Sequence, residues 1–433
     1  MQKIAELPRT LGLVDALAIV VGIVIGGGIF LVPNLVAQNL ATPTWILAVW
    51  VFAGVASFFG ALACAELGAA LPSTGGQYVF LREIYGPMTG FLCGWSMFLV
   101  ARTAQVSWLA VIVSLYVSYF VPLSALSSKL LGIGMILLFA AINYRGVSMG
   151  ALVQKAFTSA KLIGLLIIIG SALFYRGNAA AAQATAAVPF SLGHFGVALI
   201  ACLLAYDGWV QVTYVAGEIK NPKRNILLAL AGGVGACIVI YLLANMTYLH
   251  VLSIPEIAAS DHVGATAAAR TMGAGGGKLV ALVILLSIIG TLNGCFLTSP
   301  RVYFAQARDG LFFAKFAEVH PRFRTPSFAI VAQAGWSIVL LLSGTYETLI
   351  DYAMVALWIF YALMVLGVIL LRRSQPDLVR PYKMWGYPVT PVFFVAVATY
   401  FIVNTAVSRP GPSLAALGLV ATGVPVYFLW RRS

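Results

Sequence analysis

Apolar runs of about 20 residues follow one another along nearly the whole chain, from residue 12 to residue 430. A helix needs about that length to cross the hydrocarbon core of a bilayer, which is about 30 Å thick. The chain is 61% hydrophobic and only 9% charged, a composition that excludes an ordinary soluble domain. The sequence therefore predicts an all-α, multi-pass membrane protein with a single transmembrane domain over residues 1–433. The twelve predicted spans are 12–37, 45–70, 88–120, 130–147, 155–175, 193–216, 227–250, 279–300, 327–343, 349–371, 390–407 and 413–430.

The net charge of +13 follows the predicted topology of the chain. If the N-terminus is cytoplasmic, 19 of the 26 Lys and Arg residues fall in cytoplasmic segments and five fall in outer segments. The remaining two, Arg102 and Lys161, lie within spans. The positive-inside rule then places both termini in the cytoplasm, for a protein of the plasma (inner) membrane. The charge indicates orientation, and no nucleic-acid partner is expected.

Two spans contain helix-breaking residues at a similar depth. Gly26, Gly27 and Gly28 lie about 14 residues into the first span, and Asp207-Gly208 lies equally far into the sixth. Paired breaks in two halves of a transporter-like chain indicate inverted repeats with a binding site between them. The predicted repeats are 11–175 and 193–371, followed by two additional helices over 390–430.

The three glycines present backbone to a ligand, because they have no side chains to block its approach. The half-helix that restarts near Ile29 offers free amides and a positive dipole end, which suit a carboxylate. The carbonyls of Ile23, Val24 and Ile25 suit an ammonium group. A zwitterion would satisfy both ends. The alternative is close helix packing through small residues, which the matching break in the sixth span makes less favourable.

Ionisable residues within the membrane are candidates for function, because burying them is costly. Asp207 either binds a substrate amine or caps the broken helix, and capping is favoured because a restarted helix needs an N-cap in any case. Lys161 lies about two turns deeper than Lys155, so a coupling role is favoured over snorkelling to the surface. Arg102 has Glu66 or Asp207 as a possible partner, and no role is assigned to it.

Other kinds of site find little support. No histidine or cysteine pair has metal-ligand spacing, no cofactor is predicted, and no nucleotide or catalytic motif is present. All five cysteines fall within predicted spans. An enzyme is therefore not expected, whereas an amino-acid-gated channel or a transporter-derived sensor stays as an alternative to a transporter. Segment 177–193 is predicted to be a loose loop, and segment 251–278 could contain a short surface helix.

Six motifs, in order along nearly the whole chain, resemble those of the APC superfamily of amino-acid transporters, and most closely those of the L-type amino-acid transporter group. They are IGGGIF (25–30), AELGAALPSTGGQYVFLREIYG (65–86), FTSAK (157–161), AYDGW with GEIKNPKRN (205–209 and 217–225), NG with ARDG (293–294 and 307–310) and RPYKMWGYP (380–388).

The resemblance implies a LeuT-like fold of twelve helices that alternates access around broken helices 1 and 6. It implies that the amides of Gly26, Gly27 and Gly28 hold the substrate carboxylate. The carbonyls of Val24, Leu204 and Asp207 would receive its ammonium group. Relatives often carry an aromatic gate residue where this chain has Leu204, and a serine where it has Gly27. The residues implied for the side-chain pocket are Trp358 and Cys295.

The resemblance also implies sodium-independent transport, because Lys161 matches a lysine that replaces the ion between helices 1 and 8, with Ser287 as its neighbour. Animal members bind a heavy chain through a cysteine between helices 3 and 4. The corresponding segment here, VPLSALSSK (121–129), has none, so no disulfide-linked heavy chain is expected. The predicted function is secondary transport of neutral L-amino acids, by exchange or proton-linked uptake.

Overall fold

The computed structural model describes residues 7–177 and 190–430. These residues form helices and no β-sheet, apart from an isolated bridge between Leu11 and Ile219. Eleven helices are long and apolar enough to cross a membrane, and a twelfth apolar helix, Ser327–Ser343, has 17 residues. The prediction of an all-α membrane protein with twelve apolar helices is confirmed.

Four of the twelve helices are made of more than one segment. Helix 1 consists of α1 (Leu13–Val24) and α2 (Gly28–Asn39), and helix 3 consists of α5 (Pro87–Ser96), a π-helical turn (Met97–Ala101) and α6 (Arg102–Ser118). Helix 6 consists of α9 (Leu192–Ala205) and the 3₁₀ segment η3 (Trp209–Glu218). Helix 8 consists of α13 (Ala274–Thr298) and α14 (Pro300–Arg308). The others are α3 (Pro43–Ala70), α7 (Ala125–Tyr144), α8 (Val147–Leu173), α10 (Pro222–Val251), α15 (Ser327–Ser343), α16 (Tyr346–Ser374), α17 (Val389–Ser408) and α18 (Pro410–Trp430).

The fourth and fifth helices begin earlier than predicted, and local backbone signals explain the difference. The predicted ranges were 130–147 and 155–175, whereas α7 begins at Ala125 and α8 at Val147. The Ser124 hydroxyl accepts a hydrogen bond from the amide of Ser127 (3.1 Å) and caps α7. Gly146 has a φ of 148° and separates α7 from α8. Hydropathy alone does not detect either signal.

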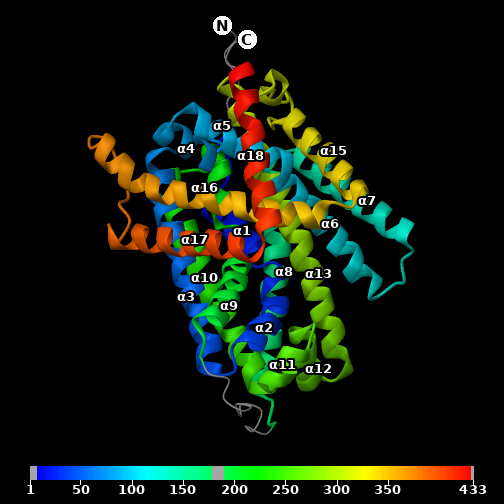
Figure 1. The fold of residues 1–433 in the computed structure, drawn as a ribbon. Coiled ribbons are helices and arrows are strands. Elements are labelled where there is room, and N and C mark those ends of the chain that lie inside the picture. Colours follow the sequence, from blue (N-terminus) through cyan, green and yellow to red (C-terminus); the bar gives the residue numbers. More distant parts are fainter. Residues whose placement is uncertain (1–6, 178–189, 431–433) are drawn as a thin grey trace.

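The long segment after α10 contains two short helices, α11 (Ile254–Ala259) and α12 (Val263–Met272), where one was predicted. An ion pair between Arg270 and Glu256 (2.6 Å) joins them. Hydrogen bonds from Arg270 lower the pKa of Glu256 to about 2, so the pair is charged at neutral pH. α11 and α12 lie at one end of the bundle, and α4 (Gln77–Tyr85) lies at the opposite end (Figure 1). The predicted loop over 177–193 falls largely outside the described residues.

The broken helices lie at the centre of the bundle. The most apolar stretches of helices 1, 6 and 8 are 67%, 72% and 72% buried, against 22% for α7 and α18. The helices that carry the glycine and Asp207-Gly208 breaks are therefore surrounded by other helices, whereas α7 and α18 lie at the periphery.

Candidate functional site

Helix 1 is interrupted at the predicted glycines. α1 ends at Val24 and α2 begins at Gly28, so the intervening backbone is not helical. The amide of Gly26 donates to the Val24 carbonyl (2.8 Å). Among the described residues, no hydrogen bond is made by the amides of Gly27, Gly28 or Ile29. These three donors lie at the positive end of the α2 dipole, where an anion is favoured.

Helix 6 is interrupted at the second predicted break. α9 ends at Ala205 and the 3₁₀ segment η3 begins at Trp209. Gly208 has a φ of 119°, a conformation that L side chains rarely adopt. The Asp207 amide donates to the Leu204 carbonyl (3.2 Å). Both breaks are therefore present where the sequence predicts them.

The two breaks pack directly against each other in a crossed arrangement. A Cβ atom on Gly28 would lie 2.9 Å from the Cβ of Ala205, where α9 ends. A Cβ atom on Gly208 would lie 2.6 Å from the side chain of Ile23, near the end of α1. The start of each second half-helix thus meets the end of the other helix's first half, and glycine makes this approach possible.

Tyr241 of α10 links the ends of the two first half-helices. Its hydroxyl lies 2.8 Å from the Val24 carbonyl and 3.0 Å from the Ala205 carbonyl, and the residue is fully buried. Since the Gly26 amide also donates to Val24, both acceptor positions of this carbonyl are occupied. The Leu204 carbonyl accepts the Asp207 amide, whereas the Tyr206 amide donates to Cys202 (3.1 Å). The sequence gives no signal for Tyr241, because a buried tyrosine in an apolar helix is common.

The Lys161 side chain of α8 reaches the unwound part of helix 1. Its Nζ lies 2.8 Å from the Gly22 carbonyl, 2.7 Å from the Ile25 carbonyl and 3.0 Å from the Ser287 carbonyl of α13. The residue is fully buried, and three acceptors match the three N–H donors of an ammonium group. The Ser287 hydroxyl adds a bond to Ile25 (2.8 Å), and the Thr291 hydroxyl lies 3.3 Å from Gly22. Thr291 was not among the predicted site residues.

Asp207 and Arg102 are connected through Tyr361 of α16. The Tyr361 hydroxyl lies 2.9 Å from the Asp207 carboxylate and 3.3 Å from an Arg102 nitrogen. Arg102 is fully buried and also donates to Tyr214 (3.0 Å). Glu66, the other possible partner, is bound instead by Arg372 (2.6 Å).

Of the remaining predicted site residues, Leu204 and Trp358 share Phe401 as a neighbour. Leu204 lines a cavity of about 340 Å³ together with Leu35 and Phe401. Trp358 is buried and stacks on Phe401, with ring centroids 4.4 Å apart. Cys295 is buried in α13.

The bonding of both breaks limits their chemistry. The amides of Gly27, Gly28 and Ile29 remain as donors. The carbonyls of Ile23 and Asp207 accept no hydrogen bond from a described residue and remain as acceptors. A small zwitterion needs both kinds of group.

Comparison with known proteins gives a consistent relationship over the whole chain. The sequence profile of the family "Amino acid permease" matches residues 11–429. The serine/threonine exchanger SteT of Bacillus subtilis is 34% identical over 431 residues, covering 98% of each chain. The human b(0,+)-type amino acid transporter 1 is 31% identical over 99% of this chain and 89% of its own. The mouse Asc-type amino acid transporter 1 is 30% identical over 98% of this chain and 82% of its own. The chain therefore belongs to the amino acid permease family of the APC superfamily and is a multi-pass membrane transporter of amino acids.

Proposed function

We propose that this protein exchanges neutral L-amino acids across the plasma membrane, without sodium, by alternating access around the two helix breaks. The observation that carries the proposal is the crossed packing of the two breaks. Together the breaks hold backbone amides at the start of α2 and carbonyls at Ile23 and Asp207 that are unpaired among the described residues. The crossed packing also supports the assignment of inverted repeats to residues 11–175 and 193–371.

The substrate carboxylate binds the amides of Gly27, Gly28 and Ile29 at the start of α2. The Gly26 amide is already bonded to Val24, so the carboxylate site begins one residue later than the motif implies. The ammonium group binds the carbonyls of Ile23 and Asp207. A further contact with Val24 requires displacement of a hydrogen bond that this carbonyl already accepts, whereas the Leu204 carbonyl accepts, among the described residues, only the Asp207 amide and has a second acceptor position.

Sodium independence is supported by the position of Lys161. Backbone carbonyls are the ligands that a half-helix end offers to Na⁺ in transporters of broken-helix design. Here the Lys161 ammonium occupies the carbonyls of Gly22, Ile25 and Ser287. The lysine places a donor group that is part of the chain where a dissociable ion would otherwise bind.

Exchange of neutral substrates is supported by one relative, the serine/threonine exchanger of Bacillus subtilis. The absence of a disulfide-linked heavy chain is supported by the cysteines. All five are buried, so none is available for a bond to another protein. The charge distribution supports cytoplasmic locations for both termini.

Uptake into proteoliposomes tests the proposed function. Purified protein is reconstituted with unlabelled L-serine or buffer inside, and labelled L-serine is added outside. Internal serine should accelerate uptake of the label. If no labelled amino acid accumulates, with or without internal amino acid or a pH gradient, the proposal fails. Single-channel current steps in planar bilayers would instead support the channel alternative.

A further inference from the structure

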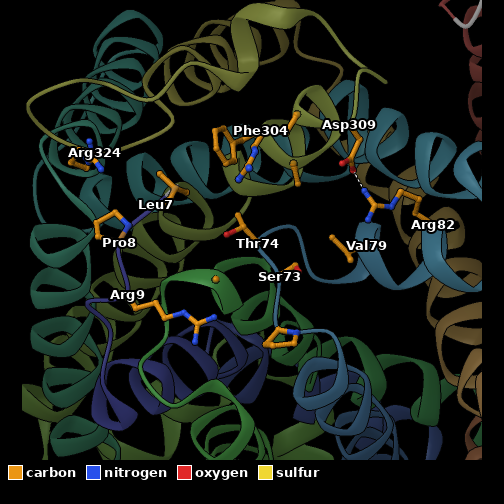
Figure 2. A pocket seen from close by; sticks show the side chains of 14 residues that line it. Leu7, Pro8, Arg9, Ser73, Thr74, Val79, Arg82, Phe304, Asp309 and Arg324 are labelled. Carbon is orange, nitrogen blue, oxygen red and sulfur yellow. Dashed lines mark hydrogen bonds and ion pairs between the residues drawn. The ribbon is translucent and has the colours of Figure 1, made fainter. Parts of the chain in front are cut away.

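A cavity of about 620 Å³ lies at the end of the bundle that carries α4, away from the helix breaks. Segments distant in sequence line it: residues 7–9, residues 72–74, the end of η3, the end of α14 and Arg324. Figure 2 shows Arg9 and Arg324 on one side of the cavity and the Arg82–Asp309 pair on the other. The proposed transport site does not use any of these side chains.

The charge of this cavity is strongly positive. Its lining contains four arginines and a single acidic residue, Asp309. That carboxylate is already bound by Arg82 and by the Tyr78 hydroxyl (2.7 Å). Arg82 in turn also contacts Glu83 (2.5 Å). The Asp309 carboxylate is therefore neutralised by Arg82 and is not available to the other three arginines of the cavity.

Arg9, Arg308 and Arg324 have no acidic partner among the described residues. Arg308 stacks on Phe304, with its guanidinium carbon 5.7 Å from the ring centroid, which leaves its N–H edges unpaired. The side chains of Arg9 and Arg324 make no hydrogen bond to a described residue and are exposed. Three like charges around one cavity repel one another, and an anion between them would relieve that repulsion.

We propose that this cavity binds a phosphate-bearing anion. Planar guanidinium groups match phosphate oxygens in pairs, and arginine is the residue that most favours such bidentate contacts. The volume lies within the range of about 300–1,000 Å³ that small-molecule sites occupy, and it exceeds the need of a single phosphate. A zwitterionic amino acid fits less well, because the same arginines repel its ammonium group. Phospholipid headgroups and soluble polyphosphates share the required chemistry.

Two binding measurements on the full-length protein distinguish these sources. In detergent, calorimetric titration with inorganic pyrophosphate measures binding of a soluble anion. In nanodiscs of phosphatidylcholine, with or without phosphatidylglycerol, the thermal midpoint measures stabilisation by an anionic headgroup. The test variant combines Arg9→Gln, Arg308→Gln and Arg324→Gln. The control combines Lys223→Gln, Arg373→Gln and Lys383→Gln, three exposed residues outside the cavity, and removes the same charge.

The expected result is that the arginine variant loses at least about tenfold in affinity for pyrophosphate, whereas the control keeps it. If pyrophosphate does not bind but phosphatidylglycerol raises the thermal midpoint of the wild type and of the control, and not of the arginine variant, the ligand is a lipid headgroup. Equal behaviour of both variants and the wild type, or no effect of either ligand on the wild type, overturns the proposal.

A substitution that removes no arginine keeps the test valid if the triple variant fails to fold. Asp309→Asn releases Arg82 and makes the cavity more positive, so pyrophosphate or phosphatidylglycerol should bind more tightly than to the wild type. Unchanged or weaker binding in this variant contradicts the proposal. Binding here does not depend on transport, so this test and the uptake test can fail independently.

Discussion

At the scale of single residues, Lys161 holds the unwound part of helix 1 against α13. Replacing Lys161 with alanine leaves the buried carbonyls of Gly22 and Ile25 without their shared donor. The Thr291 and Ser287 hydroxyls still donate to these two carbonyls, but the three hydrogen bonds of the lysine side chain are lost. A hydrogen bond to a charged group contributes about 1.5–3 kcal/mol, which corresponds to about tenfold or more in a conformational equilibrium. We expect counterflow of labelled serine to fall at least about tenfold while expression is retained.

Lys155 provides the matched control on the same helix. Its side chain is 38% exposed and pairs with Asp15 (2.8 Å), and such surface pairs contribute little. Lys155→Ala should therefore transport at nearly the wild-type rate. Wild-type rates in Lys161→Ala would remove the lysine from the mechanism.

The three glycines of the first break should not tolerate substitution equally. A Cβ atom on Gly27 would meet only Leu31, at 3.7 Å, whereas one on Gly28 would lie 3.0 Å from the Ala205 backbone. We expect Gly27→Ser to keep serine-dependent thermal stabilisation and Gly28→Ala to lose it. Loss in both variants would show that the space beside Gly27 is needed by the substrate. An unchanged thermal shift in Gly28→Ala would contradict the crossed packing of the breaks.

Residues of unusual chemistry could be found from the sequence, whereas their partners could not. Glycine runs and a membrane lysine stand out in any apolar chain, so Gly28 and Lys161 were candidates from composition and position alone. Tyr241 and Thr291 make equally direct bonds to helix 1, but ordinary hydroxyls in helices carry no such signal. Their roles depend on which helices pack together, and that information is not local.

At the scale of helices, Tyr241 couples the first halves of helices 1 and 6. Tyr241→Phe removes the single O–H donor that the Val24 and Ala205 carbonyls share. The buried Ala205 carbonyl then has no partner among the described residues, at a cost of about 1–3 kcal/mol. We expect a lower thermal midpoint and slower serine counterflow. Tyr248, also buried in α10, has a hydroxyl with no partner among the described residues. Tyr248→Phe should match the wild type, and equal effects of the two substitutions would contradict the coupling.

The end of helix 6 is held by a fully buried ion pair. Arg301 of α14 lies 2.8 Å from Glu218 of η3, and neither side chain is exposed. The Glu218 carbonyl also accepts the amides of Thr10 and Leu11, so the segment before α1 is attached at the same point. This cluster joins helices 1, 6 and 8 at one end of the bundle.

Removing one partner of this pair should be strongly destabilising. Glu218→Gln leaves the Arg301 guanidinium buried without a counter-charge, which costs about 3–5 kcal/mol in comparable pairs. A clear drop in the thermal midpoint of the purified protein is expected. Glu83→Gln, which disrupts an exposed pair with Arg82, should change it little. A Glu218→Gln midpoint equal to that of the wild type would show that the pair does not hold η3.

At the scale of the whole molecule, hydropathy and breaker positions were sufficient to predict the twelve helices and the two interruptions. They could not predict that η3 is 3₁₀ rather than α-helical, or that the two breaks cross. Those features depend on packing between segments that are far apart in the chain, for example Gly28 and Ala205, which are 177 residues apart.

The proposed orientation can be tested without altering the native cysteines. All five are buried, so a membrane-impermeant maleimide should not label the wild type in intact cells. Asp261→Cys, in the exposed turn between α11 and α12, should be labelled from outside. Lys383→Cys, exposed between α16 and α17, should be labelled only after the membrane is opened. The reverse pattern would place both termini outside.

Sodium dependence tests the central claim most directly, since the claim is that a fixed lysine replaces a coupling ion between helices 1 and 8. The initial rate of labelled serine counterflow is measured in proteoliposomes of the wild-type protein, with sodium or with choline as the only cation on both sides. The account predicts robust counterflow at the same rate in both conditions. Counterflow that requires sodium would contradict it.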